Sequence, residues 1–161
     1  MRGEIEGMSK KRTAKAPSLV DLCVWTAIDN VRYLGDVGET DIELLGKILQ
    51  HCTVDQLRHV EDSTEGRDLS PVTDVLWKNF YVKEFDENSF KGYNIEELRA
   101  EALSTMRRKK FASKWRFKFE VWMKMREVKE KISTDSLMKK YKDENASKWF
   151  GLGQTRFSTL S

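Results

Sequence analysis

The chain has 161 residues, of which 39% are hydrophobic and 34% are charged, and its net charge is +3. Its two prolines and nine glycines are too few for an all-β fold, which needs many turns, and no apolar run is long enough for a transmembrane helix. The length and the few turn residues therefore predict a single all-α domain. Two cysteines cannot form a disulfide framework, so we expect both thiols to stay reduced.

Charge is distributed unevenly along the chain. Residues 1–17 carry a net charge of +3, residues 18–100 carry −9 and residues 101–161 carry +9. An acidic body followed by a basic region predicts two different surfaces. We expect residues 1–17 to form a disordered basic tail, in which Ser9-Lys10-Lys11-Arg12 is a weak match to a nuclear address.

The first predicted helix runs from Leu19 to about Tyr33 and is capped by Ser18. Its apolar residues cover more than half of the circumference, whereas a surface helix needs a stripe of only ~100°. One side carries Leu19, Leu22, Cys23, Thr26 and Ala27. Two explanations are open: a central helix that its own domain buries, or a helix that packs on its own core and binds a partner with the other side. The shortness of the chain favours the second.

Three further helices are predicted before residue 86. Thr40-Asp41-Ile42-Glu43 and Thr53-Val54-Asp55-Gln56 are typical of capping boxes, and Ser70-Pro71 places proline at the first position of a helix. Their expected buried residues are Leu45, Ile48, Leu49 and Cys52, then Leu57 and Val60, then Val72, Val75, Leu76, Phe80 and Phe85. Residues 18–86 are therefore predicted to form a small domain of four helices.

A long basic helix is predicted in the region 87–145. Asn94-Ile95-Glu96-Glu97 caps it, and nothing interrupts it before about Ile132. Between residues 107 and 131 it has eleven Lys and Arg against three Glu, interleaved with aromatic residues. This face could pack on the rest of the protein, bind a protein partner or bind nucleic acid, with Arg107, Arg108, Lys109, Lys110, Lys114, Trp115 and Arg116 as contact residues. Residues 146–161 are predicted to be a disordered tail.

No pattern for catalysis, cofactor binding or metal binding is visible. His51, Cys52 and His59 do not match a zinc spacing, and the glycines form no phosphate-binding loop. No local signature of a nucleophile with its base is present. We therefore expect a protein that is not an enzyme and that has no cofactor.

The first helix and the segments after it together resemble a known family. Ser18, Leu19, Cys23 and Ala27 resemble the BC box, the helix by which receptor proteins bind Elongin C. The following series is similar to the F-box-like region of the Elongin A family, in order and spacing, over about residues 17–86: Asp41-Ile42-Glu43-Leu44-Leu45, Ile48-Leu49, Cys52-Thr53, Gln56-Leu57, Val60-Glu61-Asp62, Asp74-Val75-Leu76-Trp77-Lys78 and Phe85. The Trp115-Arg116 segment is similar to the part of Elongin A beyond this region.

The resemblance implies a nuclear adaptor. Elongin A proteins join Elongin B and Elongin C, stimulate elongation by RNA polymerase II, and can act as the receptor of a cullin–RING ubiquitin ligase. It implies that Elongin C is contacted by Ser18, Leu19, Leu22, Cys23, Thr26 and Ala27. It also implies that the F-box-like core, which helps to face a cullin, contains Ile42, Leu45, Ile48 and Leu49. The alternative function is a nucleic-acid-binding protein that uses the basic aromatic helix 107–131; no membrane partner is implied.

Overall fold

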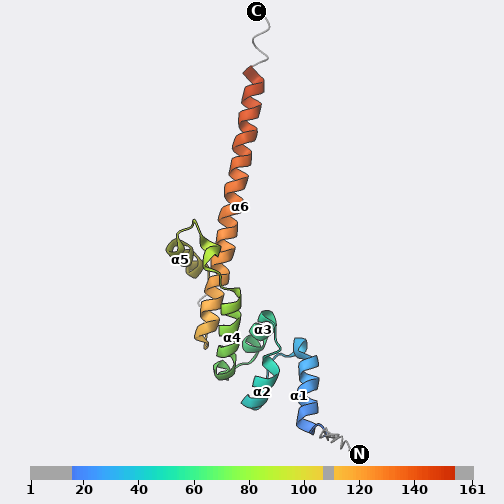
Figure 1. Ribbon diagram of the computed structural model, residues 1–161. Helices are drawn as coiled ribbons and strands as arrows, with labels where there is room; N and C mark the ends of the chain where they lie inside the picture. The colour runs from blue at the N-terminus through green and yellow to red at the C-terminus, as the bar shows by residue number, and fades with distance from the viewer. Residues whose placement is uncertain (1–15, 107–110, 155–161) are drawn as a thin grey trace, which may run out of the picture. The chain divides into compact units, whose positions relative to one another are not determined.

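The computed structural model describes residues 16–106 and 111–154, and these residues form helices and connecting loops without any strand. The predicted all-α fold is therefore confirmed (Figure 1). The chain divides into two compact units, residues 1–67 and residues 68–161. Residues 1–15 and 155–161, which belong to the predicted tails, lie outside the described residues, as do residues 107–110.

Unit 1 contains α1 (Leu19–Asp29), the 3-10 helix η1 (Val31–Tyr33), α2 (Ile42–Leu49) and α3 (Val54–Ser63). Helix α1 packs beside α2 (Figure 1). The buried hydrophobic residues of this unit are Val24, Val37, Leu45, Ile48, Leu49, Cys52, Leu57 and Val60. The predicted inward faces of α2 and α3 are thus confirmed.

The helix starts of unit 1 follow the sequence with one exception. Thr53 forms the predicted reciprocal capping box, and Ser18, predicted as the cap of α1, forms a reciprocal capping box with Asp21. Helix α2, however, is capped by Asp41, whose Oδ1 accepts from the backbone N–H groups of Glu43 (2.8 Å) and Leu44 (3.3 Å). The prediction that Thr40 caps α2 is wrong, because Thr40 lies in the preceding turn, where its N–H donates to the Val37 carbonyl.

This difference gives a first testable expectation. Asp41→Ala should lower the free energy of unfolding by ~0.5–2 kcal/mol, because it leaves two N–H groups of the first turn of α2 without their acceptor. Thr40→Ala should change it by less than ~0.5 kcal/mol, as is usual for an exposed residue without a special role. Urea denaturation of both variants measures this, and equal losses would show that Thr40 contributes to the cap.

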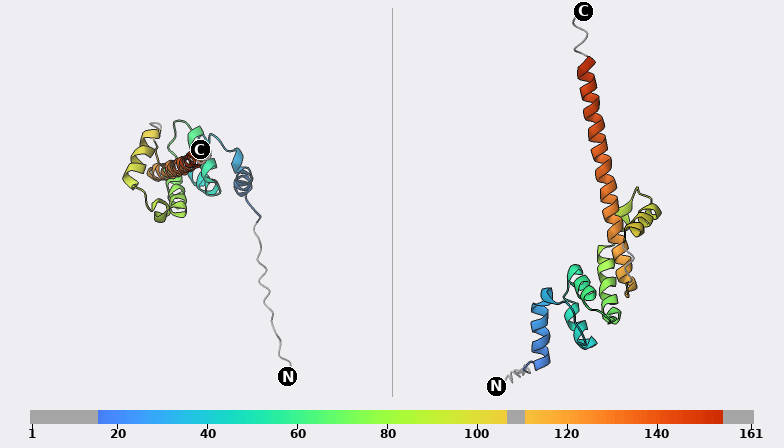
Figure 2. Two further views of the ribbon diagram at one scale, coloured as in Figure 1. Left: turned by 90° about the horizontal axis from the view of Figure 1, so that it is seen from above. Right: turned by 180° about the vertical axis from the view of Figure 1, so that it is seen from behind.

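Unit 2 contains α4 (Ser70–Glu84), the 3-10 helix η2 (Glu87–Phe90), α5 (Ile95–Thr105) and α6 (Lys114–Gln154). Both α4 and α5 pack against the first part of α6, while the last part extends beyond them (Figures 1 and 2). One core cluster joins η2, α5 and α6 and consists of Phe90, Leu98, Ala102, Val121, Trp122, Met125 and Val128.

The single uninterrupted helix predicted from residue 95 to residue 132 is wrong. The chain reverses between Thr105 and Lys114, so that α5 and α6 lie side by side. The reversal buries Leu98 and Ala102 of α5 against α6, whereas a continuous helix would leave both faces in water. Ser113 starts the second helix, since its Oγ accepts from the N–H of Arg116 at 3.0 Å.

Helix α6 also continues beyond its predicted end. The hydroxyl groups of Ser133 and Thr134 donate to the carbonyls of Lys129 and Glu130, one turn earlier, so these residues stay within the helix. The backbone is helical through residues 146–154, where the sequence predicted the start of a disordered tail.

The buried face of α4 differs from the predicted one. Val75 and Phe85 are exposed, and Val72, Leu76 and Phe80 are only half-buried. The fully buried residues are Thr73 and Trp77. The tryptophan ring lies 5.4 Å from that of Phe119 on α6, which shows that contact with α6 selects this face.

Candidate functional site

Helix α1 has one packed side and one open side. Val24 is buried, and Ala27 and Ile28 are half-buried. On the other side Leu19 is 76% exposed, and Leu22 and Cys23 are exposed as well. The explanation that α1 is a central helix buried on all sides is therefore wrong, and an apolar surface remains open along the helix.

The first turn of α1 is fixed by a pair of reciprocal hydrogen bonds. The Asp21 N–H donates to Ser18 Oγ at 3.2 Å, and the Ser18 N–H donates to Asp21 Oδ2 at 2.9 Å. Ser18 Oγ also donates to the same carboxylate oxygen at 2.7 Å. These bonds hold the turn that presents Leu19, and the hydrogen bonds from the Ser18 side chain and backbone lower the pKa of Asp21.

The lowered pKa of Asp21 has a measurable consequence. A carboxylate whose pKa is lower in the folded state stabilises the fold above its unfolded pKa, and this contribution is lost as the pH falls through the folded pKa. In Ser18→Ala the hydrogen bonds of the hydroxyl are missing, so the pKa of Asp21 should rise toward the ordinary aspartate value. Titration of the side-chain carboxyl by NMR measures both values, and an unchanged pKa in the variant would show that Ser18 does not hold this turn.

Five of the six residues predicted to contact Elongin C lie together on α1, and the sixth, Ser18, is the N-cap of this helix. Leu19, Leu22, Cys23 and Thr26 are all exposed on one side, and half-buried Ala27 lies at its border with the packed side. We call this surface, together with Trp25, the α1 face. Trp25 is 53% exposed and lies about 60° from Leu22 around the helix axis. A tryptophan that no core position requires is itself a signal of a binding surface.

Three of the four residues predicted to form the F-box-like core are buried. Leu45, Ile48 and Leu49 of α2 are buried, whereas Ile42 at the start of the helix is half-buried. The buried side chains stabilise unit 1 and offer no surface to a partner. Of these four residues, only Ile42 is accessible to another protein.

Two of the predicted basic-region residues are held by contacts within unit 2. The Arg116 side chain is buried, and its guanidinium lies 5.5 Å from the Trp77 ring centre and 5.2 Å from that of Phe111. Trp115 is half-buried beside Tyr81, and its ring is covered by the ammonium groups of Lys78 and Lys118. These cation–π contacts stabilise the pairing of α4 with α6.

The remaining residues of that set are Lys114, Arg107, Arg108, Lys109 and Lys110. Lys114 is exposed, and residues 107–110 lie outside the described residues. The start of α6 is tied to α4 through Asp74, which accepts from Ser113 Oγ at 2.6 Å and from the Trp115 N–H at 3.2 Å. This carboxylate was not predicted to have such a role, because the contact depends on the chain reversal.

Comparison with known protein families identifies the chain. Residues 34–149, which are more than two thirds of the sequence, match the family of Elongin A, one of the subunits of RNA polymerase II transcription factor SIII (Elongin). The chain belongs to the Elongin A family. No curated protein and no solved structure was found to match it.

The region shared with the Elongin A family begins after α1. It includes α2 and α3 of unit 1 and the α4–α6 assembly up to residue 149. The matched residues therefore include Trp115 and the segments from Asp41 to Phe85 that carry the resemblance to Elongin A. The α1 face lies outside the matched residues, so the family match gives no information about its role. Its role has to be inferred from the exposed side chains of α1.

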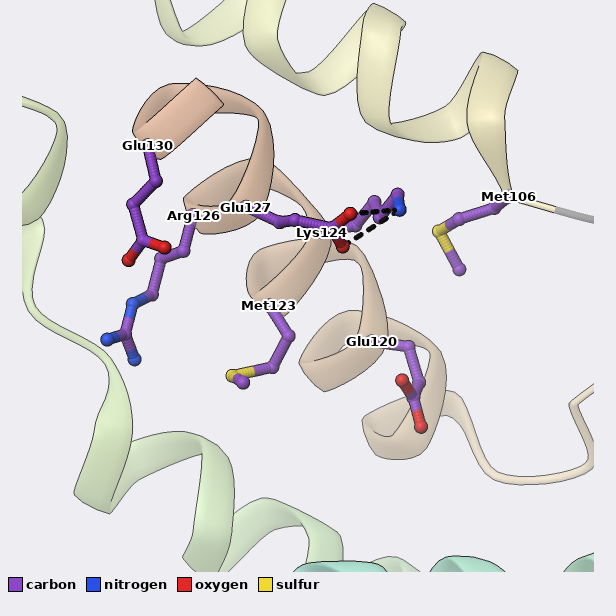
Figure 3. Close-up of a pocket in the computed structure, with 7 residues that line it drawn as sticks. All are labelled: Met106, Glu120, Met123, Lys124, Arg126, Glu127 and Glu130. Atoms are coloured by element: carbon purple, nitrogen blue, oxygen red, sulfur yellow. Dashed lines mark hydrogen bonds and ion pairs between the residues drawn. The ribbon is translucent and has the colours of Figure 1, made fainter. Parts of the chain in front are cut away.

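A depression beside α6 is lined mostly by charged side chains. It is lined by Met106, Glu120, Met123, Lys124, Arg126, Glu127 and Glu130 (Figure 3). Lys124 pairs with Glu127 at 2.8 Å, and Arg126 lies over the Trp122 ring. Within the described ranges, no three His, Cys, Asp or Glu side chains are placed to hold a metal ion, and no helix there could span a membrane.

Proposed function

We propose that this Elongin A family member binds Elongin C through the α1 face and so joins the Elongin B–Elongin C pair. In this role it is a non-enzymatic adaptor that acts in the nucleus, in transcription by RNA polymerase II and as the receptor of a cullin–RING ubiquitin ligase. The observation that carries the proposal is the open apolar side of α1, opposite the side that packs on unit 1.

The energetics of α1 support a docking role. Burying one leucine side chain contributes ~1.5–3 kcal/mol of free energy. Leu19, Leu22 and Trp25 are exposed in the free chain, so much of this free energy is not gained there. Large apolar residues that gather on one exposed face mark interaction surfaces. The α1 face therefore has more to gain from a partner than from its own unit.

The shape of the α1 face also suits insertion into a pocket. Leu19, Cys23 and Ala27 follow one another at intervals of four residues and form a ridge along the helix. The ridge begins with a large side chain and continues with two small ones. Leu19 could enter a pocket while the backbone at Cys23 and Ala27 approaches the partner closely.

The contact with a cullin is a separate part of the proposal. Only Ile42 among the predicted F-box-like residues is accessible, so this contact would use the outer side of α2 near its start. Because Leu45, Ile48 and Leu49 are buried, we expect their replacement to affect folding of unit 1 before it affects any cullin contact.

Co-purification with a tagged Elongin B–Elongin C pair tests the proposal. The unmodified chain should be retained with the pair. The Cys23→Phe variant should not be retained, because a large ring at this exposed position keeps the partner from packing closely against α1. Gln50→Phe is the matched control, since it adds the same ring at an exposed position outside α1. Failure of the unmodified chain to co-purify, or full retention of Cys23→Phe, would overturn the proposal.

A further inference from the structure

Unit 2 has an apolar groove with a volume of about 570 Å³ between the end of α4, η2, α5 and α6. Buried side chains close its base, among them Phe90, Trp122 and Met125. Its sides are aromatic and aliphatic residues that reach the solvent, namely Phe85, Ile95 and Phe117. The groove is thus an open channel over the hydrophobic core and not an enclosed cavity.

Among the described residues that line this groove, the charged side chains are positive. They are Arg99 of α5 and Lys118 of α6, and both are exposed. Neither forms an ion pair with a carboxylate within the described part of the chain. The Lys118 ammonium lies 4.4 Å from the centre of the Trp115 ring, which keeps it on the surface beside the groove. The groove therefore presents an apolar base and two cations that form no ion pair within residues 16–106 and 111–154.

We propose that this groove, which we call the Arg99–Lys118 groove, binds an acidic segment of another protein that carries aromatic or aliphatic anchor residues. The anchors would bury on Phe85, Phe117 and Trp122, and acidic residues beside them would face Arg99 and Lys118. Alternating acidic and apolar residues are typical of flexible regulatory segments, which have the side chains that this surface requires.

The segments of this chain that lie outside the described residues have the wrong charge to occupy the groove. Residues 1–15 and 155–161 are net basic, and residues 107–110 are Arg-Arg-Lys-Lys. Each of them would be repelled by Arg99 and Lys118. The expected occupant is therefore an acidic segment supplied by another protein.

The composition of the groove favours a protein segment over nucleic acid. Nucleic-acid sites are much more polar and carry many cations, because each nucleotide brings a phosphate. Of the ten described residues that line this groove, eight are aromatic or aliphatic and two are cationic. The volume lies within the range of ~300–1,000 Å³ that is usual for ligand sites and would hold a small number of apolar side chains.

The groove is independent of the proposed Elongin C contact. It belongs to unit 2, whereas the α1 face belongs to unit 1. It also lies within residues that match the Elongin A family. A partner held here would be brought to the Elongin assembly without occupying the α1 face.

Fluorescence anisotropy with the full chain and a labelled peptide, DDFEDLLDDWED, tests this inference. The peptide should bind more tightly than two control peptides, one with Phe, Leu and Trp replaced by serine and one with the acids replaced by Asn and Gln. The double variant Arg99→Glu, Lys118→Glu should weaken binding by ~10-fold or more, with a smaller effect at high salt. The double variant Lys139→Glu, Lys140→Glu, at exposed positions of α6 outside the groove, should bind as the unmodified chain does.

A second variant tests the apolar part of the groove. Phe117→Ser at the partly exposed side of the groove should also weaken peptide binding by ~10-fold, and Val82→Ser at an exposed position of α4 should not. Circular dichroism confirms that the variants keep their helices. Equal binding of the peptide and the serine control, or unchanged binding by both groove variants, would overturn the inference, as would preferential binding of oligo(dT) in competition with the peptide.

Discussion

Leu19→Ala should weaken binding of the Elongin B–Elongin C pair by about 30-fold or more and leave the thermal stability of the free chain nearly unchanged. Truncation of a central interface residue costs ~2–4 kcal/mol, and each ~1.4 kcal/mol is a factor of ten in affinity. Because the Leu19 side chain is 76% exposed, its removal creates no cavity in the free protein. Titration calorimetry and thermal melting of the same preparation measure the two quantities.

Tyr33→Ala is the matched control for this variant. Tyr33 is 73% exposed and also belongs to unit 1, but it lies outside α1. It should bind the Elongin pair as the unmodified chain does. A folded Leu19→Ala protein that binds at full strength would falsify the assignment of α1 as the Elongin C-binding helix.

Trp77→Ala should produce the largest loss of stability among the substitutions considered. The side chain is fully buried, packs on Phe80 and Phe119, and lies beneath the Arg116 guanidinium. Truncation of a buried tryptophan costs ~3–5 kcal/mol, a large part of the stability of a typical domain. Chemical denaturation followed by circular dichroism measures the loss.

The exposed residue Val75 on the same helix provides the control. Val75→Ala should change the free energy of unfolding by less than ~0.5 kcal/mol, because this side chain is 61% exposed. If the two substitutions cost the same, then α4 does not pack on α6 through Trp77. Val75, predicted from the sequence to be buried, would then be part of the core.

Local signals in the sequence predicted most of unit 1. The capping residues Ser18 and Thr53 were identified because a short polar side chain satisfies N–H groups that the helix itself leaves free. The inward faces of α2 and α3 follow from their helical periodicity. Thr40 and Asp41 are adjacent and both are good capping residues, so only the turn at Val37 decides between them.

Unit 2 was harder to predict, since its structure depends on contacts between distant segments. Neither proline nor glycine marks the reversal between α5 and α6; it is favoured by burial of Leu98 and Ala102 against α6. In the same way, Trp77 is buried on α4 because Phe119 lies opposite it. The apolar periodicity of a helix does not show which neighbouring helix packs on its apolar side.

The part of the candidate site that lies on a single helix could be predicted from the sequence. The apolar ridge of Leu19, Cys23 and Ala27 is a property of one helix, and its open position follows from the excess of apolar surface on that helix. The different environments of Trp115 and Arg116, by contrast, depend on α4. The basic aromatic pattern left packing on the rest of the protein, a protein partner and nucleic acid open, and the structure shows that Trp115 and Arg116 take part in cation–π packing.

Alkylation of the two cysteines, followed by mass spectrometry, tests the central claim most directly. Cys23 is exposed on the α1 face, whereas Cys52 is buried and its burial raises the pKa of its thiol to about 11, so it serves as an unreactive internal reference. In the free chain iodoacetamide should modify Cys23 much faster than Cys52. With the Elongin B–Elongin C pair bound, modification of Cys23 should slow by ~10-fold or more, and a complex in which Cys23 reacts as fast as in the free chain would contradict docking through the α1 face.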